Sequence, residues 1–246
     1  MILEIDCGNT LLKWRVLGRQ AEHALWQGTA QGEAELLAQM SEAGIGSLLK
    51  GRIASVRAED ETNSLVSVLH SKYSIQVDIA ESTKTLAGVT NGYLDYTLLG
   101  VDRWLAIVGA FVLRNSACLV LDVGTAVTAD FVDAVGVHLG GFICPGIRSL
   151  RNQLGISTAR VAYFPGNHAS DCDHPGRQTL EAVERGTELM LVGFVGAQVR
   201  MAHEFWGADY SLILTGGDAA LVKRHFNEAI TVPDLVFRGL ALACPD

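Results

Sequence analysis

The chain has 246 residues, of which 49% are hydrophobic and 19% are charged, and its formal net charge is −8. This length suits one large domain or two similar halves that each bury a core. Lysine and arginine are scattered through the chain without a basic run, whereas a nucleic-acid-binding protein presents a basic stripe to the phosphates. We therefore expect no nucleic-acid partner.

The start of the chain and its cysteines indicate the cellular compartment. No segment approaches the roughly 18 consecutive apolar residues of a transmembrane helix, and the first residues lack a signal-peptide pattern. The five cysteines form no Cys-x-x-Cys pair, and an odd number suits no complete disulfide framework. We expect a cytoplasmic protein with reduced thiols and no membrane partner.

The first part of the chain mixes hairpin and crossover patterns. A tight turn at Gly8-Asn9 separates the first two apolar strands. In chain order, the predicted elements are strands at 2–6, 11–17 and 24–28, a helix at 33–44, a strand within 47–56, a helix at 59–73 and a strand at 74–80. Residues 81–101 are polar and rich in turns. This order favours an α/β domain with a mixed sheet.

The second part of the chain repeats this order. Apolar residues at helical spacing follow Asp102, and residues 157–178 are rich in loop formers. The other predicted elements are strands at 117–122, 126–133 and 136–143, a helix from Pro145-Gly146, a long helix at about 179–203, a strand at 211–217 and helices at about 218–226 and 235–243. We expect two α/β halves, 1–114 and 115–246, with a boundary near 112–117.

Each half contains an aspartate that ends an apolar strand and begins an Asp-x-Gly turn. Asp6 begins "DCGNT" and Asp122 begins "DVGTA". Glycine lets the backbone approach an anion, turn N–H groups donate to phosphate oxygens, and the carboxylate holds a cation nearby. One such turn is more often ordinary hairpin chemistry. Two at equivalent positions predict a pair of turns that bind one phosphate chain.

A third glycine turn follows the apolar strand "LILT" at Thr215, Gly216 and Gly217. Its backbone could pass close to a flat ligand such as a nucleoside, or it could simply make a tight connection from strand to helix. The position of this turn, after the second Asp-x-Gly turn, favours the nucleoside site.

These motifs resemble the superfamily of actin, heat-shock ATPases and sugar kinases, and within it the type III pantothenate kinases. The matching segments span almost the whole chain in family order: "DCGNTLLK", "GVDR", "DVGTAVTAD", "GGFICPG", "TGGD" and "PDLVFRGL". The resemblance implies two actin/ribonuclease-H-like halves, each a mixed β-sheet flanked by helices, with ATP in the cleft between them. It also implies ATP-dependent phosphorylation of pantothenate to 4'-phosphopantothenate, the first step of coenzyme A biosynthesis.

The resemblance also implies roles for individual residues. Asp102 would be the general base, Asp122 would hold a monovalent cation (K⁺ or NH₄⁺), and Asp6 would hold Mg²⁺ with ATP. ATP would be bound by Asp6, Gly8, Asn9, Thr10, Lys13, Gly124, Thr125, Ala126, Thr215, Gly216 and Gly217. Pantothenate would be bound by Tyr93, Gly100, Val101, Asp102, Arg103 and Thr179.

Two of these roles have an ordinary structural alternative. Asp102 could only cap its helix while Arg103 lies in solvent, although a base at a helix start and a planar guanidinium group suit a hydroxyl and an anionic substrate. Lys13 could reach a phosphate or lie on a wet sheet face. The match to the family favours the functional interpretation for each.

Other features leave alternatives open. His168, Asp171, Cys172, Asp173 and His174 crowd one loop without the paired spacing of a structural zinc site, so a mobile loop near the substrate is expected instead. Glycines on the long helix and the family resemblance predict a homodimer.

The alternative function is that of a non-catalytic, nucleotide-binding regulatory member of the superfamily. A sugar or acetate kinase is disfavoured by the small size of the chain and by the "GVDR" segment.

Overall fold

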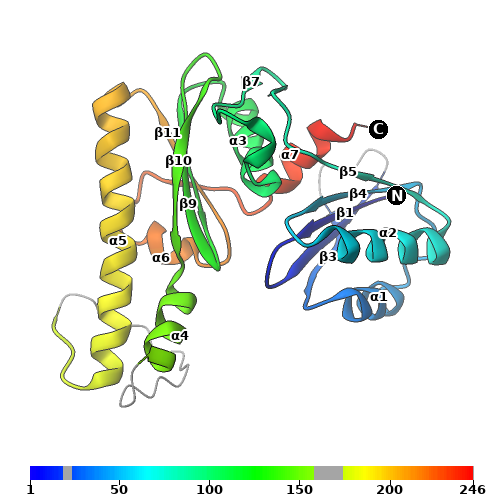
Figure 1. Ribbon diagram of the computed structural model, residues 1–246, viewed down its shortest axis with the longest axis horizontal. Helices are drawn as coiled ribbons and strands as arrows, with labels where there is room; N and C mark the ends of the chain where they lie inside the picture. The colour runs from blue at the N-terminus through cyan, green and yellow to red at the C-terminus, as the bar shows by residue number, and fades with distance from the viewer. Residues whose placement is uncertain (19–23, 158–173, 246) are drawn as a thin grey trace. The chain divides into compact units, whose positions relative to one another are not determined.

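The computed structural model describes residues 1–18, 24–157 and 174–245, which form two compact units (Figure 1). Unit 1 comprises Met1–Leu113 and Asp234–Asp246, and unit 2 comprises Arg114–Pro233. Within the described residues, no helix is both long and apolar enough to cross a membrane.

Unit 1 is built on a five-stranded sheet with the order β3-β2-β1-β4-β5. The first three strands are antiparallel neighbours, β4 pairs with β1 in parallel, and β5 pairs with β4 in parallel. Its elements are β1 (Ile2–Cys7), β2 (Leu12–Leu17), β3 (Ala24–Ala30), α1 (Glu33–Glu42), β4 (Lys50–Ser55), α2 (Glu59–Tyr73), β5 (Gln76–Ile79), β6 (Thr85–Leu86), β7 (Val89–Thr90), the 3₁₀ turn η1 (Tyr96–Leu98), α3 (Val101–Arg114) and α7 (Leu235–Ala243).

The two faces of this sheet differ because alternate residues of a strand point to opposite sides. Leu3, Ile5 and Cys7 of β1 belong to an apolar cluster with buried residues of α1 and α2. The other face of β1 carries Glu4, which is fully buried and pairs with arginines of β2 and β4. Asp6 continues this charged face at the end of β1.

Helix α7 returns to unit 1 and crosses α3 closely. A Cβ on Gly239 would lie 2.1 Å from the Leu105 carbonyl oxygen, and a Cβ on Gly109 would lie 2.7 Å from the Leu235 carbonyl oxygen. Only glycine leaves room for this approach of two backbones. The crossing braces α3, which carries the "GVDR" segment at its N-terminus.

Unit 2 has the same sheet plan, with the order β10-β9-β8-β11-β12. Again the first three strands are antiparallel neighbours, β11 pairs with β8 in parallel, and β12 pairs with β11 in parallel. Its elements are β8 (Cys118–Val123), β9 (Ala126–Val132), β10 (His138–Pro145), α4 (Ile147–Ser157), α5 (Thr179–Trp206), β11 (Ser211–Thr215), α6 (Ala219–Lys223) and β12 (Ile230–Thr231). Residues of α5 and α6 pack with β8, β9 and β11 in one apolar cluster.

The expected α/β fold with two mixed sheets is confirmed. The sequence did not predict the short strands β6, β7 and β12, because two-residue strands carry no readable periodicity. Strand β10 extends to Pro145, so α4 begins at Ile147 rather than at Pro145-Gly146. The range 115–246 expected for the second half includes α7, whereas α7 packs on β1 and β4 of unit 1.

Candidate active site

The first predicted phosphate turn is the tip of the β1–β2 hairpin. The Gly8 N–H donates to the Leu11 carbonyl oxygen at 3.1 Å, which leaves Asn9 and Thr10 exposed at the tip. Asp6 lies opposite Lys13 in the strand register, with Oδ2 and Nζ 3.8 Å apart. A carboxylate, an ammonium group and a tight turn are therefore assembled within one hairpin.

The N-terminus of α3 holds the predicted base. Oδ1 of Asp102 accepts the Arg103 backbone N–H at 2.7 Å, and Trp104 N–H donates to the Gly100 carbonyl oxygen at 2.9 Å. A Cβ on Gly100 would lie 2.8 Å from Asp102 Oδ1, so any larger residue at position 100 would displace the carboxylate. Asp102 is thus an acidic residue in the first turn of α3, at the N-terminal end of the helix.

Two of the predicted pantothenate-binding residues contact each other beside this helix start. Nη1 of Arg103 donates to the Tyr93 hydroxyl oxygen at 2.7 Å, and the guanidinium group lies 5.5 Å from the Tyr93 ring centroid. Asn91 fixes the Tyr93 loop, because its side-chain oxygen accepts the Tyr93 N–H at 3.0 Å. Arg103 is buried rather than solvated, which contradicts the alternative that it lies in solvent.

The second predicted phosphate turn joins β8 to β9 in unit 2. Gly124 N–H donates to the Ala126 carbonyl oxygen at 3.0 Å, and Gly146 N–H donates to the Thr125 carbonyl oxygen at 2.9 Å. A Cβ on Gly146 would lie 2.0 Å from the Gly124 carbonyl oxygen. The Ser149 hydroxyl also donates to the Thr125 carbonyl oxygen, at 2.8 Å. The turn is thus fixed by the "CPG" segment and the start of α4.

The third predicted turn packs directly against the second within unit 2. Thr215, at the end of β11, is paired in register with Asp122. Gly216 has a φ of +93°, and a Cβ there would lie 2.4 Å from both Asp122 Oδ1 and the Val123 carbonyl oxygen. The Asp218 N–H donates to that same carbonyl oxygen at 2.9 Å. Asp122 therefore lies against Gly216, close to the turn predicted to hold the nucleoside.

The donor groups at these turns fit the implied cations. Asp122 and the nearby Val123 carbonyl supply hard oxygen donors, which suit a group 1 or ammonium cation, and the Asp6 carboxylate at a phosphate turn suits Mg²⁺. Within the described residues, no cluster of three or more His, Cys, Asp or Glu side chains is arranged to hold a metal. His168, Asp171, Cys172 and Asp173 lie outside the described residues.

Each predicted site residue can be located in one of the two units. Unit 1 contains the residues of the first phosphate turn and, beside α3, the residues Tyr93, Val101 and Arg103. Unit 2 contains the second phosphate turn at Gly124 and the turn at Gly216. Thr179 is the exposed first residue of α5 in unit 2. The roles assigned to these residues stay predictions.

Arg57 and Ser149, which the sequence did not predict as site residues, support the two phosphate turns. Arg57 Nε donates to the Gly8 carbonyl oxygen at 2.9 Å. Arg57 lies at the first turn because β4 is the parallel neighbour of β1, and the carboxyl ends of neighbouring parallel strands meet at one sheet edge. Ser149 likewise does not interrupt an apolar pattern, so neither residue stands out in the sequence.

Cys7, beside the first turn, is not a nucleophile at neutral pH. Burial, reinforced by the neighbouring Asp6 charge, raises the pKa of this thiol to about 12, despite the opposing effects of Arg57 and Ser55. Because the thiolate is the reactive form, this side chain acts as a packing residue.

A protein-family model described as type III pantothenate kinase matches residues 2–201. A type III pantothenate kinase from Pseudomonas fluorescens is 51% identical over 247 residues, covering 100% of this chain and 99% of the relative. A type III pantothenate kinase from Pseudomonas aeruginosa is 50% identical with the same coverage.

Solved structures with lower identity share the fold. A protein named for the Baf family of transcriptional activators, from Campylobacter jejuni, has a TM-score of 0.62 at 22% identity, with 96% of this chain and 94% of that chain covered. A protein assigned as a 2-dehydro-3-deoxygalactonokinase, from Sinorhizobium meliloti, has a TM-score of 0.57 at 12% identity, with 99% and 98% covered. The family model and the relatives that match along the full length show that the chain belongs to the type III pantothenate kinase family.

Proposed function

We propose that this chain transfers the γ-phosphoryl group of ATP to the 4'-hydroxyl of pantothenate, with Asp102 as the general base. The observation that carries the proposal is the start of α3, where Gly100 leaves room for the Asp102 carboxylate beside the buried Arg103, which is hydrogen-bonded to Tyr93. A base and a planar anion-binding group next to each other suit a substrate that has both a hydroxyl and a carboxylate.

In the proposed reaction, Asp102 accepts the proton of the attacking hydroxyl. A bond forms between that oxygen and the γ-phosphorus, and the bond from the γ-phosphorus to the β–γ bridging oxygen breaks, so ADP leaves. Lys13 and the turn N–H groups at Asn9, Thr10 and Thr125 hold the phosphates. Phosphoryl transfer depends mainly on such positioning and charge neutralisation.

Two cations complete the proposed site. Asp6 would hold Mg²⁺ with the ATP phosphates, and Asp122 would hold K⁺ or NH₄⁺ beside the second phosphate turn and the Thr215–Gly217 turn. Both cations would neutralise phosphate charge. The packing of Gly216 against the Asp122 carboxylate supports this assignment, since a cation at Asp122 would also stabilise the turn that holds the nucleoside.

The proposed assembly is a cytoplasmic homodimer. Support for an interface comes from Phe205 of α5 and Phe142 of the edge strand β10, which are 53% and 42% exposed. Both rings pack on Phe131 of β9, with centroids 5.8 and 6.2 Å away, so they belong to one aromatic surface. Exposed aromatic clusters and uncovered edge strands are typical of protein interfaces.

An acceptor-discrimination assay separates the proposed kinase from the alternative of a regulatory nucleotide-binding protein. ADP formation would be followed with pantothenate, glycerol or acetate, in potassium and in sodium buffer. We expect ADP formation with pantothenate only, and faster turnover in potassium. Nucleotide binding without pantothenate-dependent turnover in potassium would favour the regulatory alternative, and equal rates in the two salts would remove the cation role of Asp122.

A further inference from the structure

Arg57 lies next to the first phosphate turn because of the strand order in unit 1. Strand β4 is the parallel neighbour of β1, and Ser55 at its end is paired in register with Cys7. The pairing continues one residue further, where the Val56 N–H donates to the Cys7 carbonyl oxygen at 3.1 Å. The next residue of the chain, Arg57, therefore begins alongside Gly8.

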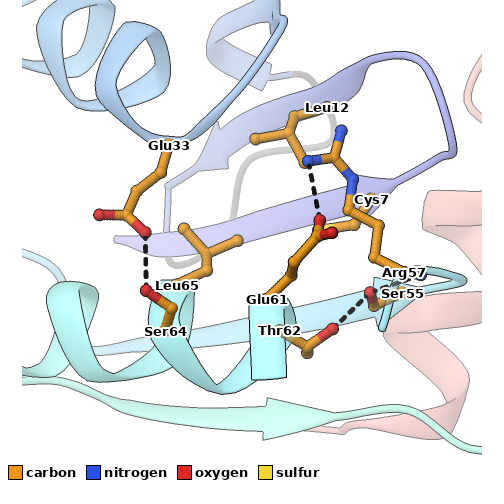
Figure 2. Close-up of a pocket in the computed structure, with 9 residues that line it drawn as sticks. All are labelled: Cys7, Leu12, Glu33, Ser55, Arg57, Glu61, Thr62, Ser64 and Leu65. Atoms are coloured by element: carbon orange, nitrogen blue, oxygen red, sulfur yellow. Dashed lines mark hydrogen bonds and ion pairs between the residues drawn. The ribbon is translucent and has the colours of Figure 1, made fainter. Parts of the chain in front are cut away.

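The Arg57 side chain contacts the turn itself. Its Nε donates to the Gly8 carbonyl oxygen at 2.9 Å, and the side chain is 18% exposed. Its Nη1 lies 3.8 Å from a carboxylate oxygen of Glu61, whose side chain is 60% exposed. Figure 2 shows the guanidinium group near Leu12, between the hairpin and helix α2, with its contact to Glu61 drawn as a dashed line.

The contact with the carbonyl also determines where the adjoining N–H points. In a planar trans peptide, the C=O of one residue and the N–H of the next point in opposite directions. The described part of the chain contains no cis peptide bond. When Arg57 holds the Gly8 carbonyl, the Asn9 N–H must point away from Arg57. If this peptide rotated so that the Gly8 carbonyl faced a phosphate, the carbonyl oxygen would repel the phosphate, and the Asn9 N–H could no longer donate to it.

The first phosphate turn has a pocket on one side and the charged side chains of Asp6 and Lys13 on the other. Arg57 lies on the side of Cys7, Leu12 and helix α2, where these residues line a pocket of about 230 Å³. Asp6 and Lys13 alternate with Cys7 and Leu12 along their strands, so they point to the opposite face of the sheet. Arg57 lines this pocket and holds the Gly8 carbonyl, so the Asn9 N–H points away from the Arg57 side of the turn.

We infer that Arg57 is a positioning residue of the ATP site, which orients the Gly8–Asn9 peptide so that the Asn9 N–H can donate to an ATP phosphate. The inference rests on the proposed function of this turn. It assigns Arg57 to nucleotide binding through the backbone, with no contact to pantothenate.

Steady-state kinetics of Arg57→Met test the assignment, because methionine keeps the unbranched stem of the side chain and removes the guanidinium donors. We expect the KM for ATP to rise about tenfold, the size of a lost hydrogen bond to a charged group. The KM for pantothenate should change less than about twofold. Arg57→Lys, which retains a donor, should recover part of the ATP affinity. Glu61→Gln is the matched control. It leaves the hydrogen bond from Arg57 to the Gly8 carbonyl in place, so the KM values for ATP and pantothenate should both be unchanged.

A second measurement uses the pocket beside Arg57. In Arg57→Ala, millimolar methylguanidine can occupy the space left by the side chain, and we expect it to restore binding of a non-hydrolysable ATP analogue measured by calorimetry. Thermal unfolding of each variant checks that the fold is retained.

The outcomes distinguish this inference from the proposed function. Pantothenate-dependent turnover in the unmodified protein with an unchanged KM for ATP in Arg57→Met would overturn the role of Arg57 alone. Equal losses for ATP and pantothenate, accompanied by a lower unfolding temperature, would show that Arg57 only stabilises the fold. Absence of turnover in the unmodified protein would instead contradict the proposed function, and calorimetry would still test the effect of Arg57 on nucleotide binding.

Discussion

Contacts of single residues with the backbone shape the turns of the candidate site. Gly146 can approach the Gly124 carbonyl, and Gly216 can approach Asp122 and Val123, only because neither residue has a Cβ. Arg57 and Ser149 then hold one carbonyl of each turn. The side chains with proposed chemical roles, Asp6 and Asp122, are thus supported by residues whose function is to fix the backbone.

Gly216→Ala should impair both stability and nucleotide binding. Its φ of +93° is unfavourable for alanine, and the new Cβ would lie 2.4 Å from two oxygen atoms. We expect the free energy of unfolding to fall by about 2 kcal/mol or more, measured by urea denaturation, with weaker binding of an ATP analogue.

Gly217→Ala is the control for this substitution, since a Cβ there meets nothing within 4 Å. Its free energy of unfolding should stay within about 0.5 kcal/mol of the unmodified protein. Equal effects of the two substitutions would show that the close packing at Gly216 has no energetic role.

The sequence predicted those site residues that interrupt an apolar pattern. Asp6 and Asp122 stand out because a carboxylate ends a buried strand, and the turn glycines follow them. Arg57 does not stand out in this way. Its role depends on β4 lying beside β1 in parallel, which is a contact between residues far apart in the sequence.

Among the secondary-structure elements, α7 shows most clearly what the sequence pattern could not predict. The pattern predicted a helix at 235–243, and the structure has one at Leu235–Ala243, but in unit 1. The helix is held there by polar contacts: Arg52 Nη1 donates to the Cys244 carbonyl oxygen at 2.7 Å, and Arg15 Nη1 donates to Asp234 Oδ2 at 3.1 Å. Both arginines also pair with the buried Glu4. Local periodicity carries no information about such long-range contacts.

The contact of α7 with Arg15 predicts a pH-dependent stability. Burial raises the pKa of Asp234, but the hydrogen bonds and charges of Arg238 and Arg15 outweigh it and lower the pKa overall. A lowered folded-state pKa stabilises the fold at pH values above the unfolded value, near 4, and the gain is lost as pH falls through the folded-state pKa. Asp234→Asn should therefore lower the free energy of unfolding by about 0.5–1 kcal/mol at pH 7, a small value because the carboxylate is partly exposed to solvent. Below about pH 4 the difference between the variant and the unmodified protein should become progressively smaller.

Urea denaturation of the variant and the unmodified protein across this pH range measures the difference. Asp209→Asn, the same substitution at an exposed position of unit 2, serves as the control. A destabilisation by Asp234→Asn that is as large at pH 3 as at pH 7 would rule out the ionic origin of this contact.

At the scale of the whole chain, the strand order of unit 1 is repeated in unit 2. In both units the sheet has three antiparallel strands side by side, followed by two strands that continue it in parallel. Each unit also begins with a strand that leads into an Asp-x-Gly turn. The sequence predicted this repetition because the β-β-β run with its turn occurs twice. It could not assign the last residues to a unit, since that depends on packing.

The proposed homodimer gives a prediction at the same scale. Phe205→Glu places a charge on the aromatic surface formed with Phe142, and we expect it to weaken self-association at least tenfold in sedimentation velocity. Leu25→Glu changes an exposed apolar residue of unit 1 and should leave association unchanged. A monomeric unmodified protein at micromolar concentration, or an unaffected Phe205→Glu dimer, would contradict this interface.

The most direct test of the account compares the unmodified protein with Asp102→Asn, which keeps the shape of the side chain and removes the base. ADP and 4'-phosphopantothenate would be quantified together in potassium buffer, and ATP-analogue binding would be measured by calorimetry. We predict equal amounts of the two products from the unmodified protein, and a kcat at least about 100-fold lower for Asp102→Asn with unchanged ATP-analogue binding. A fully active Asp102→Asn, or ADP formed without 4'-phosphopantothenate by the unmodified protein, would contradict the account.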